Sequence, residues 1–492
     1  MPVTAISHCQ APAPRPARTA RLIVPACGLL AIYFTGFLYV SDYPSYFRLL
    51  TAWMLAPFPH PFIDWEWIPS AVECWHKGVD VYVDNTCYLP VAHGRHNYSP
   101  LWLRATFLPY GAEWVMPFGL AYAVLFFVCL GSLPAPRRRR DIGIMLLASM
   151  SSLVAFALER ANADVLLFIL ITGGAHLWGG GFARRLSAYA VFVLVGLLKF
   201  YPLVLFVMAV RERIGAFLAI SVALCATIAV FVYELGGEMV SATGSILGGS
   251  YFTDMFGAVN LPYGLLRVVL ATVKSAHLPG LALLESIELP VARVLFCLLI
   301  VEAVVRAIWL AGRGRLRAGL ADMPSYEIGF LIAGAALVCG CFFAGQSVGY
   351  RSIFLLLALP GFLRLSQTLP DRSSRTALLA TCVAIVFVMW VLTIQFLLFI
   401  FGLSDVLSGA SGPVGALHWL AHELAWWWII GVLLSVLLSF VANSQTWFTV
   451  CEALGLSLFG PGSTSRSRAL QALRLACLPP GRNQRRDMVN IC

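Results

Sequence analysis

Charge is what this sequence lacks. Only 12% of its 492 residues are Asp, Glu, Lys or Arg, whereas soluble domains carry roughly 25%. Hydrophobic residues make up 60% of the chain, and apolar runs of about 17–25 residues, enough to cross a bilayer as a helix, recur along most of it. These runs do not alternate with polar residues, which excludes membrane-spanning strands. The composition excludes a large soluble protein and predicts an all-α polytopic membrane protein.

Motifs for nucleotides and metals are also missing. No Gly-rich phosphate loop is present, which argues against an ATP-driven pump. None of the 13 cysteines has zinc-site spacing, and His418 and His422 lack a third ligand, so no metal or other cofactor is expected. Most cysteines lie in apolar runs, where they act as small hydrophobic residues. Cys74 and Cys87 lie instead in a polar loop, where they would either pair, in an oxidising compartment, or stay reduced.

The net charge of +10 is an orientation signal. The basic residues form short clusters between apolar runs, where the positive-inside rule places them. The clusters are Arg15/Arg18/Arg21, Arg137 to Arg140, Arg184-Arg185, Arg211/Arg213, Arg313/Arg315/Arg317 and Arg372/Arg375. We therefore expect membrane lipids around the chain, no nucleic-acid partner, and these clusters on the cytoplasmic side.

This orientation gives a consistent path through the membrane. The first span runs from about Arg21 to Val40, and long external loops follow at about 41–111 and 234–288. The other expected spans are Trp114–Pro134, Ile144–Leu158, Asp164–Gly181, Leu186–Val210, Ile214–Tyr233, Pro290–Leu310, Tyr326–Gly345, Tyr350–Leu365, Ala377–Phe401 and Trp419–Val441. The prediction is about 11–12 transmembrane helices in four regions. These are a cytoplasmic tail (1–20, not a cleavable signal peptide), a main module (21–365), C-terminal helices (366–441) and a basic cytoplasmic tail (442–492).

The segment Leu186–Val210 carries arginines at both ends and Lys199 in its middle. A charge inside an apolar helix is costly, and Pro202 removes a backbone donor. We expect two short helices with Lys199 near their apex, facing a cavity. The alternative is a lysine that snorkels from the end of a span.

The first external loop concentrates acidic residues, notably Asp64 and Glu66. A carboxylate near the interface can serve as a general base if its surroundings tune its pKa. Trp65 and Tyr82 offer flat faces suited to sugar rings. An amphipathic interfacial helix with solvated acids is the alternative interpretation.

Three further polar motifs flank expected spans. Residues 97–101 read as a turn into a helix. Glu159–Asp164 holds four hydrogen-bonding groups in six residues, and Arg160 would suit a phosphate, although a salt-bridged hairpin turn explains the segment equally well. Gly345–Arg351 places Arg351 at a helix start, where an anion is favoured, or forms a simple interfacial anchor.

In this order, the motifs resemble the GT-C class of integral-membrane glycosyltransferases, and most closely glycosyltransferase family 87. That family has an external Asp, a Gly-x-Asp-x-Tyr element, a Tyr-x-Pro-Leu helix entry, a Glu-Arg-Gly-Asn-x-Asp turn, a Lys-x-x-Pro element and a late Tyr-Arg element. The positions that resemble them are Asp64; Gly78, Asp80 and Tyr82; Tyr98, Pro100 and Leu101; Glu159, Arg160, Asn162 and Asp164; Lys199 and Pro202; and Tyr350 and Arg351. The resemblance covers roughly residues 20–365, with Ala161 where related chains often have Gly.

The resemblance implies a GT-C-like bundle that transfers a sugar, often mannose, from a polyprenyl-phosphate donor to a lipid or glycan acceptor, with no required metal. Asp64 would deprotonate the acceptor hydroxyl, with Glu66 in support, and the anomeric carbon would invert. The residues implied for the donor phosphate are Lys199, Arg160 and Arg351. Those implied for substrate binding are Tyr82, Tyr98, Asn162, Asp164, Tyr201 and Tyr350.

Two other functions fit the same sequence features. A transporter or a lipid-linked-sugar flippase would also have an intramembrane lysine in a broken helix, although no internal repeat is seen. A sugar-binding or assembly protein would keep the fold without catalysis. The expected location is a bacterial inner membrane, with the site facing outward.

Overall fold

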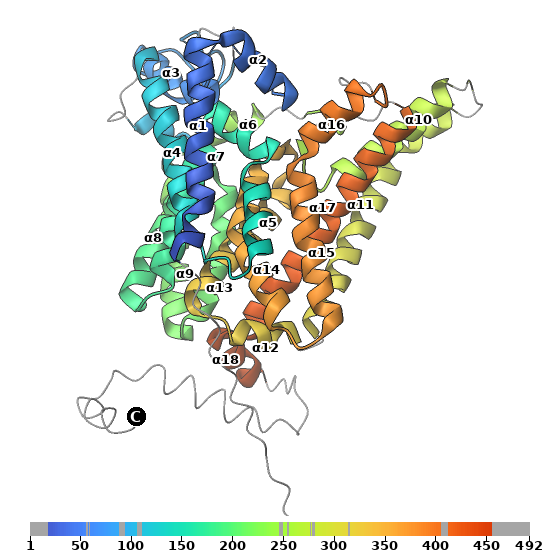
Figure 1. Cartoon of the computed structure of the whole chain (residues 1–492). Coiled ribbons are helices and arrows are strands. Elements are labelled where there is room, and N and C mark those ends of the chain that lie inside the picture. The colour runs from blue at the N-terminus through green and yellow to red at the C-terminus, as the bar shows by residue number, and fades with distance from the viewer. Residues whose placement is uncertain are drawn as a thin grey trace, which may run out of the picture.

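The computed structural model describes residues 18–55, 58, 60–87, 94–105, 111–245, 249–252, 255–275, 277, 281–312, 315–404 and 412–454. The described chain is a bundle of helices with one two-stranded sheet (Figure 1). The elements before residue 212 are η1 (Arg18–Arg21), α1 (Ile23–Ser41), α2 (Tyr43–Ala52), α3 (Ile63–His76), η2 (Trp102–Arg104), η3 (Ala112–Trp114), α4 (Val115–Ser132), α5 (Arg139–Ser149), α6 (Ser152–Arg160), α7 (Ala163–Trp178), α8 (Phe182–Lys199) and η4 (Tyr201–Arg211).

The second half of the chain continues the bundle. Its elements are α9 (Ile214–Gly244), β1 (Met255–Phe256), α10 (Asn260–Ser275), α11 (Leu281–Gly312), α12 (Arg315–Ala321), α13 (Ser325–Ala344), β2 (Ser347–Val348), η5 (Gly349–Phe354), α14 (Leu355–Thr368), α15 (Arg372–Met389), α16 (Val391–Ile400), α17 (Gly412–Ala442) and α18 (Gln445–Ala453).

Seven of the described helices are long and apolar enough to cross a membrane. The pair α5 and α6, bent by 46°, makes eight if it is counted as one span. These helices confirm an all-α polytopic membrane protein. They are fewer than the 11–12 expected spans because several apolar segments form short helices inside the bundle. Helices α7 and α14 have 16 and 14 residues, fewer than the roughly 20 needed to span alone.

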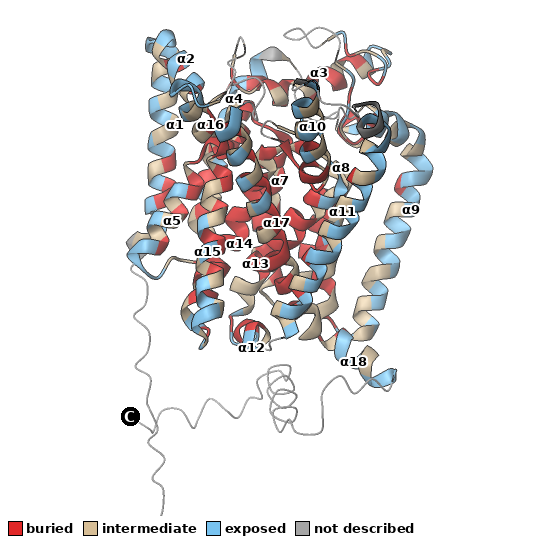
Figure 2. Cartoon of the chain, turned by 90° about the vertical axis from the view of Figure 1, so that its right-hand side faces the viewer, coloured by how far each residue is buried: buried red, intermediate tan, exposed pale blue. Residues whose placement is uncertain are grey.

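The C-terminal helices belong to the same bundle as the rest. One apolar core runs from Val24 in α1 to Phe440 in α17, and α17 packs against α11 and α13. Figure 2 places the buried residues along α13, α14 and α17, with exposed residues on the outer helices. The boundary expected at residue 365 therefore does not separate two packing units.

Both segments that the sequence predicts as long external loops contain regular structure. The first holds α2 and α3. The second is largely helical: α9 continues to Gly244, and α10 and the start of α11 fill most of the rest. Strand β1 pairs antiparallel with β2, with Met255 opposite Val348 and Phe256 opposite Ser347. The expected loop at 234–288 is thus corrected to helices plus one strand tied to the start of η5; Asp254 lies outside the described residues.

Helix α13 connects the two ends of the bundle. Near its start, Glu327 pairs with Arg137 at 3.3 Å and Arg364 at 3.7 Å. Its other end leads through β2 to η5, which carries Arg351. Its 20 residues extend about 30 Å, the thickness of a bilayer core. The end with α2 and α3 lies at the top of Figure 1, and the end with α12 and α18 at the bottom.

Candidate functional site

Asn162 lies at the centre of a hydrogen-bond network at the α3 end of the bundle. It caps α7, and its Oδ1 accepts from the backbone N–H of Asp164 at 3.0 Å. The same oxygen accepts from Lys199 Nζ at 3.3 Å. Its Nδ2 donates to Asp64 Oδ2 at 2.7 Å and to the Tyr350 hydroxyl at 2.9 Å. An amide offers two donor hydrogens and two acceptor lone pairs, so this one uses all four and connects α3, α7, α8 and η5.

Asp164 holds the two nearby cations in place. Its Oδ1 lies 2.9 Å from Lys199 Nζ and accepts from the Tyr201 hydroxyl at 2.7 Å. Its Oδ2 lies 3.5 Å from Arg351 Nε. The Asp164 side chain is 0% exposed, and a buried carboxylate is tolerated only when it is paired in this way. Substrate binding by Asp164 stays a prediction, and its contacts show that it holds Lys199 and Arg351 in position.

A sharp reversal of the chain brings Lys199 and Tyr201 to the same carboxylate. Helix α8 ends at Lys199, η4 begins at Tyr201, and the two pack against each other. Phe200 between them has φ 51°, in a region that L-residues rarely occupy. The Trp102 indole donates to the carbonyl of Leu198 at 3.2 Å, which satisfies a carbonyl at the helix end. The two short helices with a lysine at their apex therefore form as the sequence predicts.

Asp64 reaches the network from the first turn of α3. The backbone N–H of Phe62 donates to the carbonyl of Glu159 at 2.6 Å, which ties the start of α3 to the end of α6. Asp64 is half-buried. Burial raises the pKa of its carboxyl above the ordinary value, against the hydrogen bond from Asn162 and the charge of Arg160. A raised pKa in a partly accessible carboxyl is typical of a general base.

Arg160 neighbours Asp64 from the end of α6. It pairs with Glu159 at 3.3 Å, and its guanidinium carbon lies 4.1 Å from the centroid of the Phe58 ring. Ala161, which follows, has φ 45° in the left-handed region. Glycine is favoured in that conformation, so Ala161 adopts it at some cost in backbone strain. Arg160 is 5% exposed and its charge is already paired, so it is less available to a phosphate than the sequence predicts.

The predicted tyrosines surround the two cations. Lys199 Nζ lies 5.3 Å from the centroid of the Tyr98 ring, and the Arg351 guanidinium carbon lies 5.0 Å from that of Tyr201. Both distances are within cation–π range. Tyr350 joins through its hydroxyl, as given above. The structure thus brings together three of the four predicted tyrosines, Tyr98, Tyr201 and Tyr350.

Two predicted residues lie outside this network. Glu66 pairs with His60 at 3.0 Å; two residues from Asp64 on one helix, it points to another side. The Tyr82 hydroxyl donates to Glu238 of α9 at 3.4 Å, and Glu238 also pairs with Arg104. Glu66 is therefore separated from Asp64, and Tyr82 instead links the segment after α3 to α9.

Sequence reasoning missed two residues at the site. Cys341 of α13 is buried beside the Tyr201 side chain and close to Arg351. It lies in an apolar run with no feature that marks it. Trp102, whose indole donates to the carbonyl of Leu198, lies four residues after Tyr98. This position next to a recognised motif could have indicated that it contacts the site.

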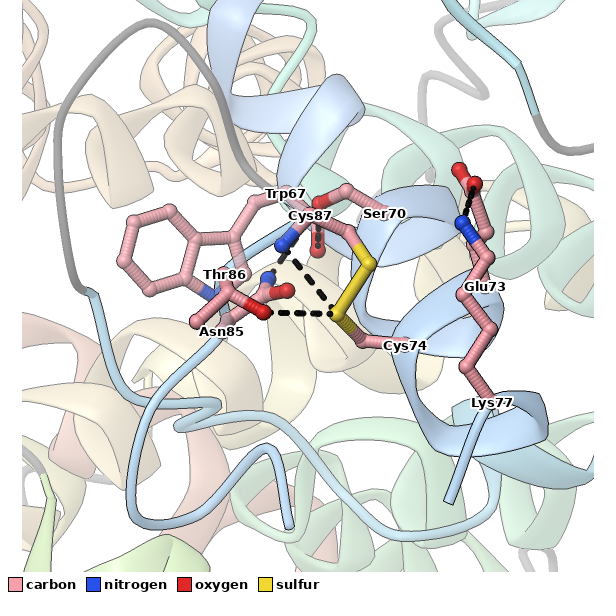
Figure 3. Close-up of a disulfide and its surroundings, with 8 residues drawn as sticks. All are labelled: Trp67, Ser70, Glu73, Cys74, Lys77, Asn85, Thr86 and Cys87. Carbon is pink, nitrogen blue, oxygen red and sulfur yellow. Dashed lines mark hydrogen bonds and ion pairs between the residues drawn. A yellow bond between two sulfur atoms is a disulfide. The ribbon is translucent and has the colours of Figure 1, made fainter. Parts of the chain in front are cut away.

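The segment that follows α3 is cross-linked to that helix by a disulfide between Cys74 and Cys87 (Figure 3). This resolves the alternative that the sequence left open. Cys74 Sγ also accepts from the backbone N–H of Cys87 at 3.1 Å, and Asn85 Nδ2 donates to Ser70 Oγ at 3.2 Å. The disulfide fixes the chain that follows α3 against that helix.

The two histidines of α17 do not form part of a metal-ligand group. Within the described ranges, no group of three or more His, Cys, Asp or Glu residues could hold a metal. His422 is buried, lies 3.1 Å from Glu423 and accepts from the Trp426 indole at 3.2 Å. It is therefore a core residue.

Together, these residues define a polytopic membrane protein with a charged, partly buried site at one end of its bundle. The site can accept a proton at Asp64. Once that proton is bound, Lys199 and Arg351 exceed Asp164 by one positive charge, which can stabilise an anion. Comparisons with protein-family models, with curated proteins and with solved structures found no match to this chain.

Proposed function

We propose that this protein is a membrane glycosyltransferase. It moves a hexose or pentose, with mannose as the first candidate, from a polyprenyl-phosphate carrier to a lipid or glycan acceptor. The observation that carries the proposal is that one amide, Asn162, bonds both a half-buried carboxylate, Asp64, and an intramembrane cation, Lys199. A base for the acceptor and a cation for the departing phosphate are the two groups that this reaction needs.

In the proposed step, Asp64 takes the proton of the acceptor hydroxyl. The acceptor oxygen then forms a bond to the anomeric carbon while the bond from that carbon to the phosphate oxygen breaks, with inversion. Polyprenyl phosphate leaves with the electron pair and gains negative charge. Lys199 and Arg351, held by Asp164, stabilise that charge, whereas Arg160 contributes to the field around Asp64.

The site is proposed to face the outside of a bacterial inner membrane. Two observations support this side. Glu327 and its arginine partners lie at the opposite end of α13, and basic clusters favour the cytoplasm. The Cys74–Cys87 disulfide lies at the end that holds the site, and disulfides persist in oxidising compartments.

The test is transfer by the purified Asp64→Asn protein, supplied with polyprenyl-phosphate sugars and analysed by mass spectrometry of the glycolipid products. Loss of a general base lowers turnover by about 10²–10⁴-fold. Glu66→Gln is the matched control, since it removes a carboxylate on the same helix that pairs with His60 outside the network. Activity of the Asp64→Asn protein near that of wild type would remove the base assignment.

A lipid-linked-sugar flippase is the second candidate, favoured by the broken α8–η4 pair with Lys199 at its apex. It would leave the chemistry of the lipid-linked sugar unchanged while moving it between leaflets. Proteoliposomes with a fluorescent lipid-linked sugar distinguish the two functions. Movement without a glycosylated product would favour the flippase.

A further inference from the structure

Helix α9 stands apart from the bundle along most of its length. Of its 31 residues only Phe231 and Ala242 are buried, and Figure 2 shows it at the right edge as a mostly exposed helix. Its N-terminal end packs against η4 and α18. Towards its other end, Phe231 stacks edge-on against Phe200, with centroids 6.2 Å apart. Between these two attachments the helix is separated from α8.

That separation leaves a cavity of about 560 Å³, which we call the α8–α9 groove. Its volume is within the ~300–1,000 Å³ range of small-molecule sites, and nearly all of its lining is apolar. The α9 side is a stripe at helical spacing, Ala216, Ala219, Ile220, Ala223, Leu224 and Thr227. The facing side of α8 contributes Phe182, Leu186, Tyr189, Ala190, Phe192 and Val193, and η4 adds Leu203 and Phe206.

The groove lies in the part of the bundle that is nearer to the basic residues at the starts of α8 and α9. It is lined by the first halves of α8 and α9, which begin at Phe182 and Ile214, whereas Lys199 ends α8 at the opposite side. A phosphate bound at Lys199 is therefore near the far end of the groove. A lipid whose chain fills the groove and whose headgroup binds the arginines would have its polar group at the basic end and not at Lys199.

Two arginines at the basic end lack an acidic partner among the described residues, Arg184 and Arg213. Both are exposed. Arg213 directly precedes α9 and lies three residues before Ala216, so it continues the groove-lining stripe. Arg185, in contrast, is bound to Glu212 at 2.5 and 2.9 Å. The basic end of the groove thus holds one ion pair, Arg185 with Glu212, and two further positive charges that have no acidic partner among the described residues.

We propose that the α8–α9 groove is a binding site for an anionic phospholipid of the leaflet at the basic end. One acyl chain fills the apolar cavity between α8 and α9, and the phosphate lies against Arg213 and Arg184. Basic pockets between membrane helices bind anionic headgroups in this way. The lipid would supply the contacts that α9 lacks with the bundle. This inference does not depend on the proposed function.

The test is lipid binding by the purified full chain, measured by native mass spectrometry with dioleoyl-phosphatidylglycerol and dioleoyl-phosphatidylcholine. We expect the anionic lipid to bind roughly 25-fold more tightly, since each of the two arginines near the headgroup contributes about fivefold. The double variant Arg184→Gln/Arg213→Gln should remove that preference. Arg372→Gln/Arg375→Gln is the matched control, because both arginines are exposed at the same end, at the start of α15.

A second variant tests the cavity itself. Ala223→Trp fills the groove and should abolish retention of one lipid, whereas Val301→Trp, on an exposed face of α11, should not. The anionic lipid should also raise the melting temperature of wild type but not of Ala223→Trp. Equal affinity for the two lipids, or an unchanged preference after Arg184→Gln/Arg213→Gln, would overturn the proposal. Displacement of phosphatidylglycerol one for one by polyprenyl phosphate would also overturn it, because the groove would then hold the carrier chain.

Discussion

Replacement of Asn162 by Asp tests the network most directly, because it puts a carboxylate where an amide now donates to Asp64. The two side chains approach to 2.7 Å, so the change converts a hydrogen bond into a pair of like charges. Unit charges 4 Å apart interact by about 4 kcal/mol at an effective dielectric constant of 20. Solvent at the half-buried Asp64 reduces this to about 2 kcal/mol, which raises the pKa of the carboxyl pair by roughly 1.5.

The assay is the pH profile of kcat/KM for sugar transfer by wild type and Asn162→Asp. A base works only when deprotonated, so the acid limb of the profile should move up by roughly 1.5 pH units. Thermal unfolding gives a measurement that does not need activity. The folded Asn162→Asp protein holds a proton that the unfolded chain releases, so its stability relative to wild type should fall as pH rises from about 4 to 7.

Two controls separate charge from lost contact. Asn162→Ala removes the hydrogen bonds without adding a charge. It loses the bond that lowers the pKa of Asp64, so its acid limb should move up, but by less than that of Asn162→Asp. Asn85→Asp makes the same chemical change at a buried amide that donates to Ser70, and it should lower stability without moving the limb. A folded Asn162→Asp protein with an unmoved acid limb and no added pH dependence of stability would refute the network.

Three further predictions follow from other contacts. Asp164→Asn leaves two partly buried cations without their carboxylate and should cost about 3 kcal/mol, seen as a lower melting temperature in nanodiscs; a melting temperature equal to wild type would contradict it. Joint replacement of Cys74 and Cys87 by Ser should remove roughly 3 kcal/mol from the external segment and speed limited proteolysis there, and an unchanged cleavage rate would count against it. Tyr350→Phe should lower transfer about tenfold through one lost hydrogen bond, whereas Tyr82→Phe should leave it nearly unchanged, and equal losses would show that the network does not define the site.

The helical class of the fold could be predicted because it depends on a property local to each segment. Continuous apolar runs and basic clusters are readable one segment at a time, and the broken pair around Lys199 was readable from one charge and Pro202. The number of long spans could not be predicted in this way. Helices α7 and α14 are apolar because they are buried inside the bundle, whereas other helices are apolar because they contact lipid. Composition does not separate these two environments.

The sequence indicated most residues of the hydrogen-bond network, but it did not indicate which of them contact each other. Asn162 and Asp164 were recognised from a polar turn, yet nothing in that turn says that the amide would meet Asp64 while the acid would meet Lys199. Those partners depend on how helices far apart in sequence converge. Tyr82 lies in a motif that resembles the family pattern, yet it is not part of the network, because its hydroxyl donates to Glu238 of α9.

The β1–β2 pair has a consequence for how the protein is made. Strand β2 precedes Tyr350 and Arg351, and its partner β1 was synthesised before α10–α13. Roughly 290 positions separate Asp64 from Arg351, and at ~5–20 residues per second their synthesis is on the order of 15–60 s apart. Asn162 follows Asp64 by 98 positions, so for about the last two thirds of that interval both residues have been synthesised and the cation from η5 has not. A chain that stops before Tyr350 can insert most of its helices, but it cannot complete the site.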